Sequence, residues 1–292
     1  MLLANALPDW MQPVDVQVKP ALDDFQPPLE QGVLWQAAKD KLLLDIPHFG
    51  RVIASRDEIH VSPEAARQWV CFGPFLRATP LAATVLLRGG FCCNAAALAG
   101  PDGAILLMGE TAAGKSALAL ALMKRGLKLM ADDAAPVFPG EDGKALAFPV
   151  WPQMHLWPDT VETILASGHP GRLLQPASQL ADNAPYHDIA EQAFASHPVP
   201  LRAIYVIQGN RRLRHVCFRP GPHGIERLSS SALLPYHRRI AAALTTPANL
   251  LRIYAAIDGT DIQYIDMPQR GLAEIEYAAD EILQECRWPT LI

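Results

Sequence analysis

The sequence lacks the features that mark secreted, membrane-spanning and disulfide-bonded proteins. Its start, MLLANALPDWMQ, has neither the basic residues nor the apolar run of a secretory signal. No window approaches the roughly 18 apolar residues of a membrane span. The five cysteines include no C-x-x-C pair, and an odd count favours reduced thiols, each a small buried side chain. These absences predict a cytoplasmic protein with no membrane partner.

An excess of positive charge is also missing. The formal net charge is −5 and the pI is about 6.0, which argues against a nucleic-acid partner. The densest basic run, Arg211–Arg219, reads as a solvated strand pair and turn. Half of the 292 residues are hydrophobic and 19% are charged, so a large core is available for one large domain or two smaller ones.

Composition and periodicity divide the chain into three regions. Residues 1–31 are rich in Pro, Asp and Gln and predict a loosely ordered arm. Residues 32–90 predict a small N-terminal module that is rich in β-structure, with a meander over KLLLDIPHFGRVIASRDEIHV followed by helical segments. Residues 91–292 carry the alternating strand and helix signals of an α/β domain. Within them, residues 166–195 are polar and predict no strand.

The residues from Gly109 to Ser116 fit the pattern G-x-x-x-x-G-K-[ST] at every fixed position. The apolar run AILLMG before them predicts a buried strand, and KSALALALMKRG after them predicts a helix that ends at Gly126. Such a loop directs backbone N–H groups and the helix dipole at a phosphate. Lys115 would contact the β- and γ-phosphates, and Ser116 would bind Mg²⁺. The predicted nucleotide-binding residues are Gly109, Glu110, Thr111, Ala112, Ala113, Gly114, Lys115, Ser116 and Ala117.

Two adjacent carboxylates follow the helix. Asp132 and Asp133 end the predicted strand LKLMADD, seventeen and eighteen residues after Lys115. A helix of about three turns and a return strand use about that many residues. Both carboxylates should therefore lie at the sheet edge that also holds the phosphates. One can hold Mg²⁺ while the other accepts a proton from an attacking hydroxyl.

The segment GETAAGKSALALALMKRGLKLMADD resembles the nucleotide-binding segment of the HPr kinase/phosphorylase family. The wider pattern, with RGGF before it and FPVWPQMHLWPD and PLRAIYVI after it, is more similar to the HPr-kinase-related enzymes that modify ribosomally made peptides, including kinases of some lasso-peptide pathways. The resemblance covers about residues 86–270. It implies a phosphate-loop kinase core of the phosphoenolpyruvate-carboxykinase-like type, with ATP and Mg²⁺ as cofactors.

The resemblance also implies residue roles. Lys115 would hold the phosphates and Ser116 the metal. Asp133 would accept the proton of the substrate hydroxyl, and Asp132 would be its partner in the metal shell. The family carries a histidine on the strand before the loop, and counting back from Gly109 places Asn94 at that position. Asn94 can form hydrogen bonds there but cannot titrate near neutral pH; the alternative is a polar residue with only a structural role.

Other segments carry weaker signals. The family's second signature, rich in Arg and Gly, has no match after Asp133, so a phosphorylase activity is not expected. The pairs Trp151/Trp157 and Met154/His155 read as core packing. Tyr236, His237, Arg238 and Arg239 read as the solvated face of a helix.

The sequence thus predicts a kinase that transfers the γ-phosphoryl group of Mg·ATP to a hydroxyl, serine in the first instance, on a peptide or small protein. Modification of a ribosomal peptide of the lasso type is one setting for that activity. The alternative is an ATP-binding regulatory or scaffold protein with little transfer activity, and Asn94 is the feature that favours it. The identity of the acceptor and the existence of a homo-oligomer are left open.

Overall fold

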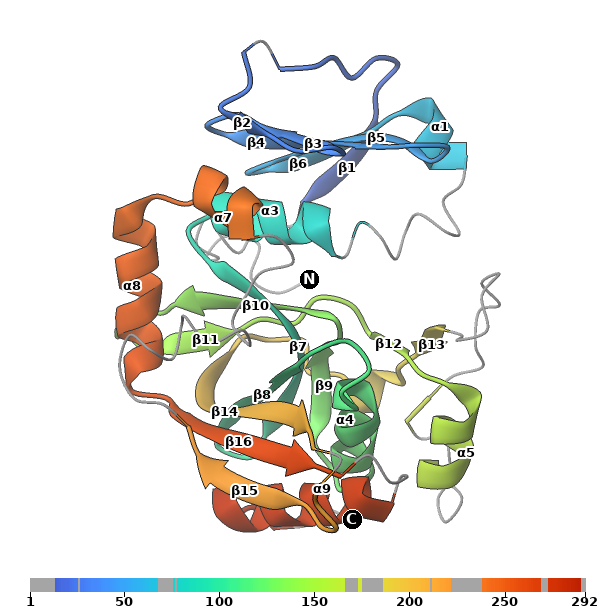
Figure 1. Cartoon of the computed structure of the whole chain (residues 1–292), viewed down its shortest axis with the longest axis vertical. Coiled ribbons are helices and arrows are strands. Elements are labelled where there is room, and N and C mark those ends of the chain that lie inside the picture. Colours follow the sequence, from blue (N-terminus) through green and yellow to red (C-terminus); the bar gives the residue numbers. More distant parts are fainter. Residues whose placement is uncertain are drawn as a thin grey trace. The chain divides into compact units, whose positions relative to one another are not determined.

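The computed structural model describes residues 14–25, 27–67, 76, 78–165, 173–174, 186–210, 212–221, 238–268 and 273–289. They form a mixed α/β structure with several sheets, divided into two compact units (Figure 1). The first unit comprises Met1–Cys92 and Pro235–Leu251, and the second comprises Cys93–Leu234 and Arg252–Ile292. None of the described helices has the length and apolar character needed to cross a lipid bilayer.

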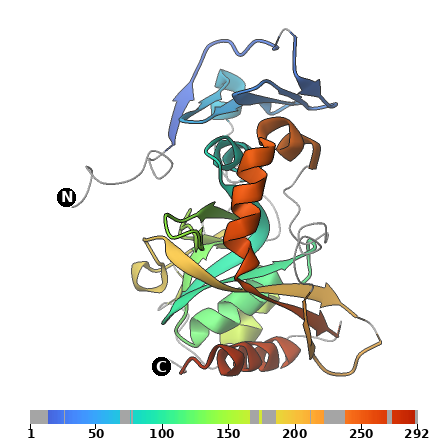
Figure 2. The ribbon, with the colours of Figure 1, turned by 90° about the vertical axis from the view of Figure 1, so that its left-hand side faces the viewer.

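The first unit is built on a six-stranded sheet in the order β1-β6-β5-β4-β3-β2. β1 pairs parallel with β6, and the other neighbours are antiparallel. The predicted meander is confirmed, because β4, β5 and β6 are consecutive in the chain and in the sheet. Figure 2 shows these strands in shades of blue, lying side by side. The strands are β1 (Asp15–Val18), β2 (Glu30–Gln31), β3 (Trp35–Ala37), β4 (Lys41–Ile46), β5 (Gly50–Ser55) and β6 (Glu58–Val61).

One face of this sheet packs against helices. Alternation along β4 places Leu42 and Leu44 in the core of this unit. Leu86 of α3 and both Ile240 and Leu244 of α7 complete the same core. The helices of this unit are α1 (Pro63–Arg67), α3 (Thr79–Leu87) and α7 (Arg238–Leu244). The sequence did not indicate that a segment so far along the chain would join the N-terminal module.

One sequence expectation for this unit differs from the structure. Residues 1–31, expected as a loosely ordered arm, contain β1 and β2 of the sheet. Arg239 is exposed, as expected for a solvated helix face. Its Nε donates to Glu30 Oε1 at 2.7 Å and its guanidinium lies over the Trp35 ring at 5.5 Å, so it also contacts the sheet. The neighbouring Tyr236 and His237 lie outside the described residues.

The second unit contains an eight-stranded sheet. Its main path is β11-β10-β7-β8-β14-β16-β15, with β9 paired to β7 and β11 also paired to β14. β14 is parallel to both β8 and β16, whereas β7 runs antiparallel to β8 and to β9. The strands are β7 (Phe91–Gly100), β8 (Gly103–Gly109), β9 (Lys128–Ala131), β10 (Ala134–Pro139), β11 (Ala145–Ala147), β14 (Val199–Gly209), β15 (Cys217–Pro220) and β16 (Asp261–Met267). The strands predicted over FCCNAAALAG, AILLMG, LKLMADD and PLRAIYVIQ are confirmed.

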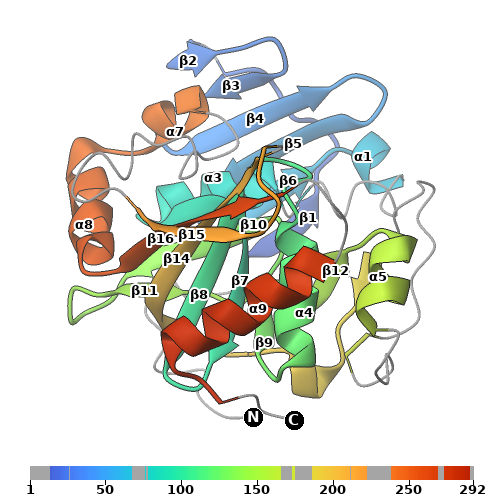
Figure 3. The same cartoon turned by 60° about the horizontal axis from the view of Figure 1, so that its bottom comes forward.

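Helix α4 (Lys115–Lys124) lies inside this unit. All six residues from Leu118 to Met123 are buried, because α4 packs on the sheet and is flanked by α5 (Pro158–Leu165) and α9 (Ala273–Cys286), as Figure 3 shows. A helix that is apolar on every side is stable only when it is enclosed in this way. Gly126, with φ at +101°, allows the chain to turn after the helix into β9. The first turn of α4 is therefore held in a fixed position by the core.

The remaining elements include one that the sequence did not predict. β12 (Gln153–His155) pairs with β13 (Tyr186–Asp188) as a separate two-stranded sheet, so the expectation that residues 166–195 contain no strand was wrong. A short helix η3 (Glu191–Ala193) follows β13, and the unit boundary falls within α8 (Pro247–Asp258). Cys217 is exposed rather than buried, and Cys71 lies outside the described residues; Cys92, Cys93 and Cys286 are buried as expected.

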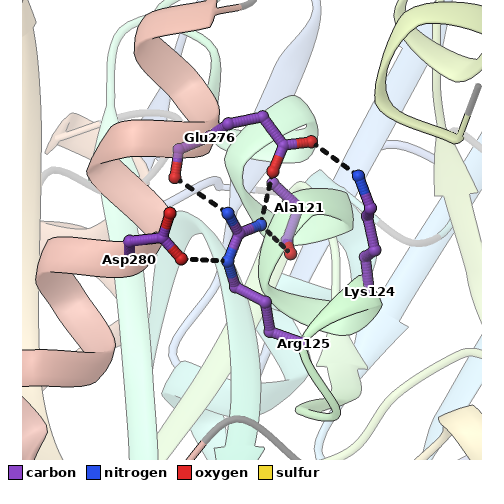
Figure 4. Close-up of polar contacts among 5 residues, drawn as sticks. All are labelled: Ala121, Lys124, Arg125, Glu276 and Asp280. Carbon is purple, nitrogen blue, oxygen red and sulfur yellow. Dashed lines mark hydrogen bonds and ion pairs between the residues drawn. The ribbon is translucent and has the colours of Figure 1, made fainter. Parts of the chain in front are cut away.

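Arg125 links the end of α4 to α9 (Figure 4). Its Nε donates to Asp280 Oδ1 at 2.7 Å, and its Nη1 donates to Glu276 Oε2 at 2.5 Å and to the Ala121 carbonyl oxygen at 3.0 Å. Lys124 Nζ contacts the other Glu276 oxygen at 3.1 Å. The Arg125 side chain is only 11% exposed. Because it is enclosed and bound on several sides, it contributes more than an exposed ion pair would.

Arg125→Met should lower the free energy of unfolding by roughly 1–3 kcal/mol, since charged hydrogen bonds are lost while the apolar stem is kept. Urea unfolding followed by circular dichroism measures the change. Arg252→Met is the matched control, because Arg252 is an exposed helical arginine whose loss should change stability by less than about 0.5 kcal/mol. Equal effects of the two substitutions would contradict the linking role of Arg125.

Candidate active site

The predicted site residues meet at one edge of the second unit's sheet. β7 pairs on one side with β8, where Ala95 is opposite Met108, and on the other side with β9, where Ala97 is opposite Ala131. β7 is antiparallel to both strands, so β8 and β9 run in the same direction. Gly109 at the end of β8 and Asp132 just after β9 are therefore at the same edge. The expectation that the loop and the carboxylates share an edge is confirmed.

The loop between β8 and α4 has the backbone geometry that its glycines allow. Gly109 and Gly114 have φ values of +154° and +95°, and Ala112 has a φ of +63°. A Cβ atom on Gly109 would meet the Ile207 carbonyl oxygen at 2.7 Å. A larger residue there would therefore force the loop away from β14. Gly114 is the residue before α4, and its carbonyl oxygen accepts the N–H of Leu118 at 2.9 Å, which begins the helix.

Lys115 points back into the loop. Its Nζ donates to the carbonyl oxygens of Gly109 at 3.0 Å and of Glu110 at 2.9 Å. The residue is 7% exposed, and burial lowers the pKa of its ammonium group, whereas the charges of Asp133 and Asp132 act in the opposite direction. Glu110, Thr111 and Ala112 at the loop mouth are exposed, and Ala113 and Ala117 are half-buried. An ammonium group enclosed by carbonyl oxygens is available to an anion that enters the loop.

Ser116 and Asp132 are joined directly. The Ser116 hydroxyl donates to Asp132 Oδ1 at 2.9 Å, and the backbone N–H of His155 donates to Asp132 Oδ2 at 3.1 Å. Burial and the neighbouring Asp133 charge raise the pKa of Asp132 to about 7, although both hydrogen bonds act to lower it. A hydroxyl and a carboxylate oxygen at this separation suit a hard cation such as Mg²⁺. These two residues could therefore hold the metal.

Asp133 occupies an unusual backbone conformation. Its φ is +69°, in the left-handed region that residues other than glycine seldom adopt. Its carbonyl oxygen accepts the N–H of Ala95 on β7 at 3.2 Å. Asn94 is the residue before Ala95 on that strand. Among the described residues, no donor lies within hydrogen-bond distance of the Asp133 carboxylate. Strain of this kind is found at functional sites.

Asn94 lies where the sequence indicated. Alternation places it on the same face of the sheet as Ala96 and Leu98, which contact the core around α4. The residue is half-buried. It is the fourth residue of β7, next to the residue that contacts Asp133, and β7 runs antiparallel beside the strand that carries Gly109. Asn94 therefore belongs to the same neighbourhood as the loop and the carboxylates.

The sequence did not identify β12, the strand whose backbone donates a hydrogen bond to Asp132. Met154 and Leu156 are buried as expected, but Trp151 is 49% exposed and Trp157 is 56% exposed, so the assignment of these tryptophans to the core was wrong. His155 contributes a backbone N–H to the site. The available signal was the alternation of polar and apolar residues within 151–157. The proline and tryptophan content of the segment obscured it.

The basic run Arg211–Arg219 only partly fits its expected form. β15 (Cys217–Pro220) pairs antiparallel with β16 and not with a second strand from the run itself. Arg219 is half-exposed, and its Nε and Nη2 donate to the two oxygens of Asp266 at 2.5 Å and 3.0 Å. Arg212 and Arg214 are exposed, as a solvated turn requires; Arg211 lies outside the described residues.

Comparisons with known proteins add little. No protein-family model and no curated protein sequence matches the chain. Among solved structures, the Hpr(Ser) kinase/phosphatase from Coxiella burnetii is similar to it with a TM-score of 0.35 and 12% sequence identity, covering 67% of this chain and 95% of that one. A likeness at this level establishes neither a shared fold nor a shared activity.

Asp132→Asn should remove a pH-dependent loss of stability. The folded pKa of about 7 lies above the ordinary value of 3.8, so this carboxyl contributes its full stability below pH 4 and loses it as the pH rises to about 7. The asparagine can bind both partners of Asp132. Its amide oxygen can accept the His155 N–H, and its amide nitrogen can donate to the Ser116 hydroxyl, which accepts as well as donates. In urea unfolding without metal, the variant should gain on the order of 4 kcal/mol over the parent between pH 4 and pH 8.

The control is Asp142→Asn, which changes an exposed aspartate in the turn before β11. Its stability should follow that of the parent at every pH. If the Asp132→Asn variant and the parent keep a constant difference from pH 4 to pH 8, the pKa of Asp132 is not raised.

Proposed function

We propose that this chain is a kinase that transfers the γ-phosphoryl group of Mg·ATP to a hydroxyl group, serine in particular, on a peptide or small protein. The observation that carries the proposal is the 2.9 Å hydrogen bond from Ser116 to Asp132. It joins the first turn of the helix after a glycine loop to a pair of strand-end carboxylates. We also propose that the core is of the phosphoenolpyruvate-carboxykinase-like type, which the sequence resemblance and the antiparallel β7 beside β8 support.

The loop supports nucleotide binding. Its backbone N–H groups and the positive end of α4 would face the phosphates. Lys115 would exchange two carbonyl partners, those of Gly109 and Glu110, for phosphate oxygens, which carry more negative charge. The exposed residues Glu110, Thr111 and Ala112 would form the rim of this site.

Ser116 and Asp132 would hold Mg²⁺, which would supply positive charge to the phosphates. Asp132 is fixed by Ser116 and by the His155 N–H, so its position is set before the nucleotide enters. Lys115 directly precedes Ser116 at the start of α4 and would add positive charge near the same phosphates. Together these side chains would stabilise the charge that develops during transfer.

Asp133 is the residue that can accept the proton. No described residue donates to its carboxylate, whereas both oxygens of Asp132 are engaged. As the acceptor oxygen forms its bond to the γ-phosphorus, the bond from that phosphorus to the β,γ-bridging oxygen breaks and ADP leaves. The hydroxyl proton passes to Asp133. Asn94 is close to this point and could only donate or accept a hydrogen bond.

A second candidate is an ATP-binding regulatory or scaffold protein with little transfer activity. The observation that favours it is Asn94, which supplies no titratable group where the resembling family has a histidine. Incubation with γ-labelled ATP and serine-containing peptides separates the two functions, because only the kinase transfers label to peptide. Label transfer by the parent supports the kinase; ATP binding without transfer to any peptide supports the scaffold.

Lys115→Met should raise the Kd for Mg·ATP roughly 10- to 100-fold, the effect of losing about 1.5–3 kcal/mol of charged hydrogen bonding. The methionine keeps the apolar stem, so the protein should remain folded. Calorimetric titration with Mg·ATP gives the Kd values. Lys128→Met is the control, since Lys128 is an exposed lysine at the far end of β9. Unchanged affinity in the Lys115→Met variant would refute the phosphate-binding role of the loop.

Asp133→Asn should retain Mg·ATP affinity within about threefold and lower transfer to peptide by roughly 100-fold or more, because an amide cannot accept the hydroxyl proton. Asp132→Asn should instead increase the Mg²⁺ concentration needed for half-maximal transfer. Single-turnover transfer at several Mg²⁺ concentrations distinguishes these effects. If Asp133→Asn transfers phosphate at the parent rate, another group is the base.

A further inference from the structure

The segment of residues 151–157, here called the tryptophan strand, contains β12 (Gln153–His155). Met154 and Leu156 contribute to the core of the second unit. At the two ends of the segment Trp151 is 49% exposed and Trp157 is 56% exposed, and these two side chains make up its outward face. Exposure of this much aromatic surface is costly in water, and tryptophan is the residue most often found at the centre of binding surfaces.

The tryptophan strand is physically continuous with the candidate active site. The N–H of His155 donates to Asp132 at 3.1 Å, so the centre of the strand is in direct contact with a carboxylate of the site. On its other side the strand pairs with β13, where Gln153 Nε2 donates to Asp188 Oδ1. The His155 and Trp157 rings are 6.4 Å apart. The centre of the tryptophan strand is thus fixed beside Asp132.

We propose that the tryptophan strand is the docking surface for the acceptor peptide, and that it selects peptides with an aromatic or large aliphatic side chain close to the phosphorylated hydroxyl. This inference rests on the proposed kinase function and specifies its substrate class. An acceptor that presents its hydroxyl to Asp133 must lie over a surface next to Asp132. The outward face of this strand is such a surface, and its tryptophans give it an apolar character that a side chain of the acceptor can cover.

The distances limit where the selected side chain lies. An extended chain rises about 3.3 Å per residue, so Trp157 lies at most about 7 Å and Trp151 at most about 13 Å along the chain from His155. An extended acceptor has the same rise. Its apolar residue should therefore lie two to four positions from the phosphorylated serine.

The test uses a positional-scanning library of nine-residue peptides with one fixed central serine, phosphorylated with γ-labelled Mg·ATP. The parent should prefer Trp, Phe or Leu over Ala at a position two to four residues from the serine. In the Trp157→Ser and Trp151→Ser variants the ratio of transfer to the preferred peptide and to its alanine counterpart should fall about tenfold, through KM and not kcat. The Kd for Mg·ATP should not change.

Tyr277→Ser is the matched control. Tyr277 is 50% exposed but lies on α9, so its removal should leave the peptide preference intact. The same peptides, labelled with fluorescein, are also titrated with each protein in the presence of a non-hydrolysable ATP analogue. Fluorescence anisotropy then reports binding independently of transfer.

Each outcome decides the inference. Transfer with no preference for apolar residues, or a preference that survives in both tryptophan variants, overturns the docking surface and leaves the kinase function standing. Binding of the apolar peptides that depends on Trp151 and Trp157, without transfer, supports the docking surface and overturns the kinase function. If the parent neither binds nor phosphorylates any peptide, both are overturned.

Discussion

Strand β7 runs antiparallel to both of its neighbours β8 and β9, and the position of every charged group in the candidate site depends on this pairing. Because β8 and β9 must then run in the same direction, the loop after one and the carboxylates after the other come to one edge. If β7 were antiparallel to one of these strands and parallel to the other, Asp132 and Gly109 would lie at opposite ends of the sheet. The short turn at Gly100–Gly103 enforces the antiparallel arrangement, since a parallel pair requires a long crossover.

The second unit tolerates a locally unfavourable arrangement at this edge. Lys115 is enclosed, Asp132 is kept from full ionisation by burial and by Asp133, and Asp133 itself has a strained backbone. Groups arranged in this way lower stability unless an anion and a cation arrive to complete them. The apolar helix α4, buried on all sides, supplies the compensating stability and fixes the first turn where Lys115 and Ser116 begin.

Local patterns in the sequence predict much of this edge, and non-local contacts account for what they miss. The apolar run before Gly109, the helix that ends at Gly126 and the return strand to Asp132 are each short-range signals, so the spacing of the loop and carboxylates follows from them. The exposure of Trp151 and Trp157 depends instead on which face of a short strand meets the core. The contact of His155 with Asp132 joins residues 23 positions apart, and no local rule reports it.

The core of the first unit is completed by a late segment of the chain. Leu42 and Leu44 pack with Ile240 and Leu244, so during synthesis the apolar face of the early sheet waits for about 180 further residues. At about 5–20 residues per second this delay is on the order of 10–40 s. For that period the sheet lacks the part of its cover that α7 supplies, which a chaperone could shield. An expressed fragment that stops at Cys92 would leave this part of the apolar face uncovered, so a soluble form of the first unit needs residues 235–251 fused to it.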